Sequence, residues 1–271
     1  MAAGLFDLSG KVAMVTGAGA NGGVGHAIAL GYARAGARLI ICDIDEDGLE
    51  RTRSELGDAA VLAMRCDISR DDQVEALFAA SNANGCAIDV LVNVPFVFPR
   101  RSQPHEVTLA DWERMFEVNV AGYFLCIRAA IPGMLAKGSG AIINIGSNAG
   151  VSALGRGAFA YSCTKAAVHQ MTRELAIEYG RRGIRANAIL PAQMRTPGLA
   201  SHLANPAFRD GVLPRILAGL PMNRLLEPED MVGPAIFLAS DAASAVNGVL
   251  LPVDGGNLAM NAGGSPGEAS A

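Results

Sequence analysis

Short apolar runs recur along the whole chain and are separated by longer stretches of helical character. The runs are Val12 to Val15, Leu39 to Cys42, Val61 to Met64, Val90 to Val92, Ala141 to Ile145, Ala186 to Leu190 and Val249 to Val253. They lack the polar alternation of strands that face water on one side, so they predict parallel strands covered on both faces. Because helices fill the spaces between them, we predict an α/β fold, a doubly wound parallel sheet of about seven strands.

The same pattern predicts a single domain that carries a covering segment and a tail. Residues 1–256 contain all the predicted strands. Residues 193–225 are rich in Pro, Gly, Leu and Met, which indicates a mobile cover over an apolar pocket. Residues 257–271 contain mostly Gly, Ala, Ser and Asn, so we expect a flexible C-terminal tail.

The longest predicted helices, Asp111 to Met134 and Ala158 to Tyr179, carry apolar stripes. Such stripes are typical of packing within one chain. Gly and Ala are also frequent on these helices, so close pairing between subunits is the alternative, and the pattern does not separate the two.

Composition narrows the possible partners. The chain has 271 residues, 51% of them hydrophobic and 18% charged, with a formal net charge of −4. This balance disfavours nucleic acid and anionic membranes as main partners, and it favours small molecules. The five scattered cysteines form no metal or disulfide pattern, so we expect a reduced, cytoplasmic protein without a metal. No apolar run reaches the length of a membrane helix, about 18 residues, so we expect none.

A glycine-rich turn follows the first predicted strand and precedes a predicted helix, Ala27 to Ala35. It runs Gly17-Ala18-Gly19-Ala20-Asn21-Gly22-Gly23-Val24-Gly25. Glycine leaves no side chain between backbone and ligand, and a helix start offers free N–H groups to a pyrophosphate. Gly17, Asn21, Gly23, Val24 and Gly25 are therefore candidate cofactor-binding residues.

An acidic residue, Asp43, ends the second predicted strand, 18 residues after Gly25. A carboxylate at this place can accept hydrogen bonds from an adenosine ribose. It would repel a 2′-phosphate, and the following Ile44 offers no compensating cation. The sequence therefore predicts NAD rather than NADP as the cofactor.

Tyr161 and Lys165 stand four residues apart, so on a helix their side chains share one face. Hydride transfer at a carbinol carbon needs a group that exchanges the hydroxyl proton. A tyrosine has a pKa of about 10, so its ionisation near pH 7 needs roughly 4 kcal/mol of stabilisation. The charge of Lys165 can supply part of this, while its other donors hold the nicotinamide ribose.

Ser147 ends another predicted strand, at the edge of the sheet where ligands bind in such folds. Its hydroxyl can orient the substrate oxygen. The four histidines have no spacing that suggests a catalytic triad or a metal set, so we do not expect Ser147 to act as a nucleophile.

Taken together, these residues resemble the motifs of the short-chain dehydrogenase/reductase family from about Leu8 to Gly256. The matching motifs are Thr16-Gly17, Gly23-Val24-Gly25, Cys66-Asp67-Ile68, Val118-Asn119-Val120, Ser147, Tyr161-x-x-x-Lys165, Pro191 to Thr196 and Val253-Asp254-Gly255-Gly256. The resemblance implies a Rossmann-like, NAD-binding catalytic domain, usually in a homotetramer.

The resemblance also implies roles for individual residues. Tyr161 would be the acid/base, Ser147 the partner of the substrate oxygen, and Lys165 a partner of both cofactor and tyrosine. Asn119 would maintain a proton-relay water. Among the remaining cofactor contacts, Asp67 and Ile68 would border the adenine, Asn93 would begin the segment after the fourth strand, and Pro191 and Thr196 would lie near the nicotinamide.

The chain departs from the family pattern at three places. Gly17 and Gly23 are six residues apart, where the family usually has four. The family's Asn-Asn-Ala-Gly is replaced by Asn93-Val94-Pro95-Phe96, and Ala192 stands where a glycine is usual. The last change is the smallest and stiffens the loop slightly.

The opening of the chain, from Leu5 to Val12, resembles family members that oxidise sugar acids and polyols, and also ketone and 3-oxoacyl reductases. Arg100, Arg101 and Arg156 lie near the predicted site in sequence, so an anionic sugar, sugar acid or hydroxy acid is the favoured substrate. The alternatives are a 3-oxoacyl or cyclic-ketone reductase and, in another class, a non-catalytic protein that senses NAD.

Overall fold

The computed structural model describes residues 4–19, 22–196, 199 and 202–260. Seven strands form one parallel sheet in the order β3-β2-β1-β4-β5-β6-β7. The strands are β1 Val12–Thr16, β2 Arg38–Asp43, β3 Ala60–Arg65, β4 Val90–Asn93, β5 Gly140–Ile145, β6 Ile184–Pro191 and β7 Leu250–Val253. The predicted doubly wound sheet is confirmed, and each apolar run lies within or overlaps a strand.

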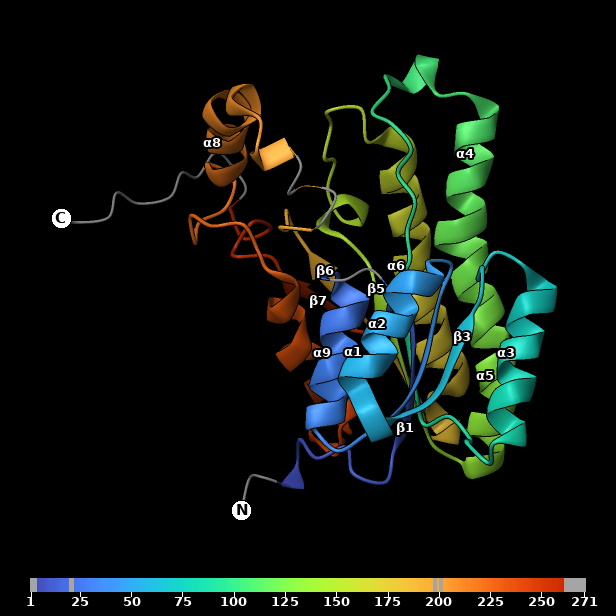
Figure 1. Ribbon diagram of the computed structural model, residues 1–271. Coiled ribbons are helices and arrows are strands. Elements are labelled where there is room, and N and C mark those ends of the chain that lie inside the picture. The colour runs from blue at the N-terminus through green and yellow to red at the C-terminus, as the bar shows by residue number, and fades with distance from the viewer. Residues whose placement is uncertain (1–3, 20–21, 197–198, 200–201, 261–271) are drawn as a thin grey trace.

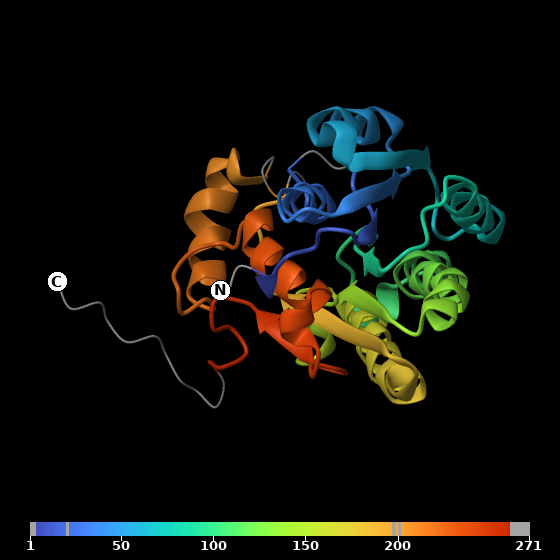
Figure 2. The same ribbon diagram turned by 90° about the horizontal axis from the view of Figure 1, so that it is seen from below.

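Helices cover both faces of the sheet (Figures 1 and 2). The helices are α1 Val24–Arg34, α2 Glu46–Leu56, α3 Asp71–Ala83, α4 Leu109–Phe116, α5 Gly122–Lys137, α6 Phe159–Tyr179, α8 Leu213–Leu217 and α9 Val232–Ala239. Successive side chains of a strand point to opposite faces. In β1, for example, Ala13 and Val15 pack with α1 and α9, whereas Val12 and Met14 pack with α3 and α5.

The direction in which the strands are added reverses between β1 and β4, which pair with each other as neighbours. In open α/β sheets, ligands bind beyond the carboxyl ends of the strands at such a reversal. The glycine turn follows β1, and the segment that begins with Val94 follows β4. The topology therefore brings both to the place where a cofactor would bind.

The stretch predicted as one helix, Asp111 to Met134, is continuous but changes character midway. Residues Glu117–Ala121 form a π-helical segment between α4 and α5. The whole helix, Leu109–Lys137, has 29 residues. An 18-residue window of it has a mean hydropathy of 1.4, so the helix is long and apolar enough to cross a membrane. The apolar runs of the sequence did not indicate such a helix. Half of that window is buried inside the protein, where α5 packs against α3, β4 and β5, so it has the character of a core helix.

The described part of the predicted cover, residues 193–225, has an apolar cluster of its own. Ile216, Leu220 and Leu225 are its buried members. The stem of the segment is closed where the Arg195 N–H donates to the Leu226 carbonyl at 2.7 Å. Helix α8 of this segment lies beyond one end of the sheet, above β6 and β7 in Figure 1.

Candidate active site

The glycine turn and the start of α1 pack closely together. A Cβ built on Gly25 would lie 2.1 Å from the carbonyl oxygen of Gly17, so only glycine fits there. Gly23 is the N-cap of α1 and has no side chain with which to cap the first turn. The N–H groups at this end of α1, which begins at Val24, can therefore donate to a pyrophosphate. Asn21 lies outside the described residues.

Asp43 is held in place at the end of β2 by two backbone hydrogen bonds. The Gly19 N–H donates to Oδ2 at 2.8 Å, and the Asp45 N–H donates to Oδ1 at 3.0 Å. A Cβ on Gly19 would lie 2.8 Å from the Asp43 Cβ, so glycine allows the turn to lie against the carboxylate. Each carboxylate oxygen keeps lone-pair capacity for ribose hydroxyls, and the turn therefore fits a dinucleotide.

Tyr161 lies in the first turn of α6, and Ser147 lies two residues beyond Ile145, the last residue of β5. Burial raises the pKa of the Tyr161 phenol to about 12, while a hydrogen bond with Ser147 acts in the opposite direction. The Ser147 hydroxyl also accepts the Ala149 N–H at 3.2 Å, which fixes the turn after the strand. The structure thus brings the predicted acid/base and the predicted orienting hydroxyl together.

Lys165 lies one turn after Tyr161 and is 1% exposed. Its Nζ donates to the Ile145 carbonyl at 2.7 Å, which leaves two of its three hydrogens for other acceptors. Burial lowers the pKa of Lys165 to about 7. The amine is therefore placed to change its charge near neutral pH, beside the phenol that it is expected to activate.

Three aromatic rings surround the Lys165 amine. The distances from Nζ to the ring centroids are 5.4 Å for Tyr123, 5.6 Å for Phe96 and 5.9 Å for Tyr161. Aromatic faces at this range attract a cation. Phe96 stands where the family has a small residue, and its ring also lies 5.8 Å from the ring of Tyr161. The sequence identified Phe96 as a departure but gave no sign that it would reach the catalytic pair.

Pro95, next to Phe96, packs against the glycine turn. A Cβ on Gly17 would lie 2.9 Å from the Pro95 Cγ. The side chain of Asn93 points the other way, because its Nδ2 donates to Asn144 Oδ1 at 3.0 Å within the buried interior. The side chain of Asn93, a fully buried residue, is therefore not available to a cofactor.

Asn119 lies in the π-helical segment and connects three parts of the site. Its Oδ1 accepts the Val97 N–H at 2.7 Å, and its Nδ2 donates to the Val97 carbonyl at 3.0 Å and to Thr164 Oγ1 at 3.2 Å. The side chain thus anchors the segment after β4 to α6. The predicted water at Asn119 stays a prediction.

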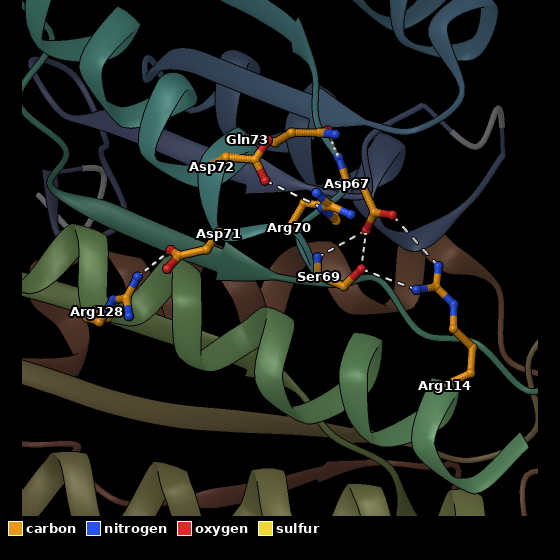
Figure 3. A network of polar contacts seen from close by, with 8 residues as sticks. All are labelled: Asp67, Ser69, Arg70, Asp71, Asp72, Gln73, Arg114 and Arg128. Atoms are coloured by element: carbon orange, nitrogen blue, oxygen red, sulfur yellow. Dashed lines mark hydrogen bonds and ion pairs between the residues drawn. The ribbon is translucent and has the colours of Figure 1, made fainter. Parts of the chain in front are cut away.

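The residues predicted to border the adenine lie at the start of the β3–α3 connection. Asp67 accepts hydrogen bonds from the backbone and hydroxyl of Ser69, and Arg114 lies 3.7 Å away from its other oxygen (Figure 3). Neighbouring ion pairs, Arg70 with Asp72 and Arg128 with Asp71, hold the start of α3. Ile68 is buried against Gly122 of α5, so only its backbone could face a nucleotide.

The two residues predicted near the nicotinamide lie at the stem of the covering segment. Pro191 is the last residue of β6 and pairs with Val253 of β7. The Thr196 N–H donates to the Met194 carbonyl at 3.0 Å. Both residues therefore lie at or beyond the carboxyl end of β6, the edge of the sheet at which the nicotinamide is predicted to bind.

The sequence assigned no role to two supporting residues, His169 and Asp254, although Asp254 stands in one of the matched motifs. His169 accepts the Ser147 N–H through Nε2 at 3.3 Å. Asp254 accepts Asn148 Nδ2 at 2.9 Å and so ties the β7 end to the turn after Ser147. A spacing signal existed for His169, because it lies four residues after Lys165 and eight after Tyr161 on the same helical face.

Comparison with known proteins bears on the family and the fold of the chain. The family model described as enoyl-(acyl carrier protein) reductase matches residues 17–257. D-threitol dehydrogenase of Mycolicibacterium smegmatis is 38% identical over 253 residues, which cover 93% of this chain and 94% of that protein. The chain belongs to the short-chain dehydrogenase/reductase family. It is thus an oxidoreductase of the kind that uses a nicotinamide cofactor.

Other short-chain dehydrogenases/reductases are equally similar. Cis-4-hydroxycyclohexanecarboxylate dehydrogenase of Sinomonas cyclohexanicum is 38% identical over 253 residues, with coverage of 92% of this chain and 97% of that protein. A solved structure described as a putative NAD(P)-dependent gluconate 5-dehydrogenase of Beutenbergia cavernae, with bound NADP at low occupancy, has a TM-score of 0.84. It is 39% identical and covers 94% of this chain and all of its own.

Proposed function

We infer that the protein interconverts a secondary alcohol and a ketone by hydride transfer, with Tyr161 as the acid/base. The observation that carries this proposal is the convergence of Tyr161, Ser147 and Lys165 at one edge of the sheet, beside the glycine turn. Replacing Tyr161 with Phe removes the proton donor and retains the ring. We expect this variant to bind cofactor and to lose turnover of any accepted alcohol.

Ser147, Tyr161 and Lys165 each have a separate role in the reaction. Ser147 orients the substrate oxygen, and Tyr161 takes the hydroxyl proton during oxidation or returns it during reduction. The ammonium form of Lys165 favours the phenolate, while its two free hydrogens are available to the ribose of the cofactor. The nicotinamide supplies the chemistry that these side chains lack, the acceptance or donation of a hydride.

We propose NAD as the preferred cofactor. The fixed carboxylate of Asp43 supports this, because it can accept ribose hydroxyls and repels a 2′-phosphate. The related structure with NADP makes a direct comparison necessary. Initial rates with NAD should exceed those with NADP by at least about tenfold, which corresponds to roughly 1.4 kcal/mol. Equal rates with both cofactors would overturn the preference.

For the substrate, we propose an anionic sugar, sugar acid or hydroxy acid. Arginines near the site and the similarity to enzymes named for hydroxycyclohexanecarboxylate and gluconate support this class. A panel of polyols, hydroxy acids, cyclic alcohols and 3-oxoacyl substrates separates it from the two reductase alternatives. Specific cofactor binding without turnover of any member of that panel would instead favour an NAD-sensing protein, in which Phe96 blocks the catalytic pair.

We further propose that the protein is a cytoplasmic homo-oligomer, by expectation a tetramer. All five cysteines are free thiols, in keeping with a reducing compartment. Large apolar side chains are exposed on the long helices, with Leu109 at 70%, Phe124 at 49% and Ile177 at 81%. Such surfaces are typical of faces covered by another subunit. Light scattering coupled to size-exclusion chromatography measures the mass, and a monomer would contradict this proposal.

A further inference from the structure

Three arginines, Arg100, Arg101 and Arg156, lie near the site in sequence, but their guanidinium groups have different partners. Arg100 forms an ion pair with Asp111, with 3.2 Å between Nε and Oδ2. Among the residues that the structure describes, neither Arg101 nor Arg156 forms an ion pair with a carboxylate. Two of the three cations therefore remain available to an anion from solution.

The backbone holds Arg101 and Arg156 side by side. Nη1 of Arg101 donates to the Arg156 carbonyl at 2.9 Å. The next residue, Ser102, donates its N–H to the Gly157 carbonyl at 3.1 Å and forms a parallel bridge with Ala158. The two segments are thereby joined over a short distance, although more than fifty residues separate them in the sequence.

The loop around Arg156 has an unusual backbone. Arg156 has a φ of 54°, and the flanking Gly155 and Gly157 have φ values of 62° and 74°. A left-handed conformation is uncommon for a residue with a Cβ and costs free energy. A Cβ on Gly157 would lie 2.8 Å from the Ser102 nitrogen, so the close pairing of the two segments also requires glycine there.

The two guanidinium groups repel each other in this arrangement. Burial lowers the pKa of Arg101, and the nearby charge of Arg156 lowers it further. The charge of Arg156 thus makes the cationic form of Arg101 less favourable, and no described carboxylate forms an ion pair with Arg101 to compensate. An anion bound between them would relieve this repulsion and accept charge-assisted hydrogen bonds from both.

The pair also lies close to the catalytic tyrosine. The Arg101 guanidinium carbon is 5.4 Å from the centroid of the Phe98 ring. The Phe98 ring is itself stacked on the ring of Tyr161, with 5.2 Å between centroids and 29° between planes. The Phe98 ring therefore lies between the Arg101 guanidinium and the proposed acid/base.

We propose that Arg101 and Arg156 bind a carboxylate of the substrate while its secondary hydroxyl lies at Tyr161 and Ser147. This rests on the proposed function and adds a constraint on substrate shape. Because Phe98 lies between the two ends, the carboxylate is several bonds away from the reacting carbon. A 4-hydroxycyclohexanecarboxylate meets this requirement, whereas a 2-hydroxy acid, in which the two groups are on adjacent carbons, does not.

The test measures how the charge of the substrate affects turnover. It uses two substrates of similar shape that differ in charge, and variants that each lack one arginine. The substrates are 4-hydroxycyclohexanecarboxylate and its neutral carboxamide. The variants are Arg101→Gln and Arg156→Gln, with Arg100→Gln as the control because its guanidinium already pairs with Asp111. The ratio of kcat/KM for carboxylate over carboxamide should fall by about ten- to a hundredfold in the first two variants, the range of a charged hydrogen bond. It should keep its parent value in the control.

A binding measurement separates this proposal from the proposed function. Calorimetry with cyclohexanecarboxylate, which has no hydroxyl to oxidise, should give a dissociation constant that rises in Arg101→Gln and Arg156→Gln and not in Arg100→Gln. If no alcohol is turned over and this pattern is still found, the carboxylate site stands and the proposed function fails. If alcohols are turned over and the three variants have the same carboxylate preference as the parent, the site is overturned and the function stands.

Discussion

Replacing Phe96 with Leu tests whether the ring near Lys165 acts on the charge of the amine. The ring centroid is 5.6 Å from Nζ, and Nζ is fully buried. A desolvated cation gains about 1–2 kcal/mol from an aromatic face, so loss of this ring should lower the pKa of Lys165 by roughly one unit. Burial has already lowered that pKa to about 7. At pH 7 the charged fraction should therefore fall from about a half to about a tenth.

The consequence should appear at Tyr161. The ammonium form stabilises the phenolate, so a smaller charged fraction at pH 7 leaves fewer molecules in which Tyr161 can accept the hydroxyl proton, and kcat/KM for alcohol oxidation at pH 7 should fall. His169 faces the same amine, but its pKa is lowered to about 4, so it stays neutral through this range. Tyr123 contributes another ring and no charge to the arrangement, because burial raises its pKa.

Two measurements check this expectation. One is the pH profile of alcohol oxidation. The other needs neither cofactor nor substrate: the pH titration of the Lys165 side chain followed by NMR, assigned by comparison with a Lys165→Met variant. Phe96→Tyr keeps an aromatic face and serves as the control. A Leu variant in which Lys165 titrates at the parent pH would refute the reasoning, provided that its circular dichroism matches the parent.

Further predictions concern packing and pH. Gly25→Ala should cost about 3 kcal/mol or more, because the new Cβ would lie 2.1 Å from the Gly17 oxygen. Gly233→Ala in α9 adds a Cβ with no neighbouring atom within 4 Å outside its own helix, so stability should stay unchanged or rise by up to about 1 kcal/mol. Similar denaturant midpoints for Gly25→Ala and Gly233→Ala would contradict this contrast. Burial, and then the charge of Lys165, lowers the pKa of His169 from 6.5 to about 4. Across that window the unfolded chain binds a proton that the folded protein does not, so the thermal midpoint should fall as the pH falls. His169→Gln should flatten that slope, and an unchanged slope would exclude His169 as its source.

The strands and the catalytic spacing could be predicted because each depends on local sequence. Seven apolar runs became seven strands since buried parallel strands need continuous apolar side chains. Tyr161 and Lys165 met because one helical turn brings positions four apart onto one face. Neither inference needs knowledge of distant parts of the chain.

The remainder depends on contacts between segments that are far apart in the sequence. The position of Phe96 follows from the bonds of Asn119 to Val97, and these are visible only once α4 and α5 are placed beside β4. The difference between Arg100 and Arg101 likewise depends on where Asp111 lies. The inward direction of the Asn93 side chain depends on Asn144 in the neighbouring strand. Residue type and spacing contain none of this information.

The covering segment has its own apolar cluster, and this has a consequence for how the enzyme could acquire new substrates. Among the residues that the structure describes, Ala192 alone packs against both that cluster and the cluster on one face of the sheet. Substitutions at Ile216, Leu220 or Leu225 would therefore change the packing of the covering segment while the packing around the sheet is preserved. Substitutions in this segment can therefore be selected with little effect on the folding of the sheet. Substrate specificity can then diverge faster than the catalytic residues.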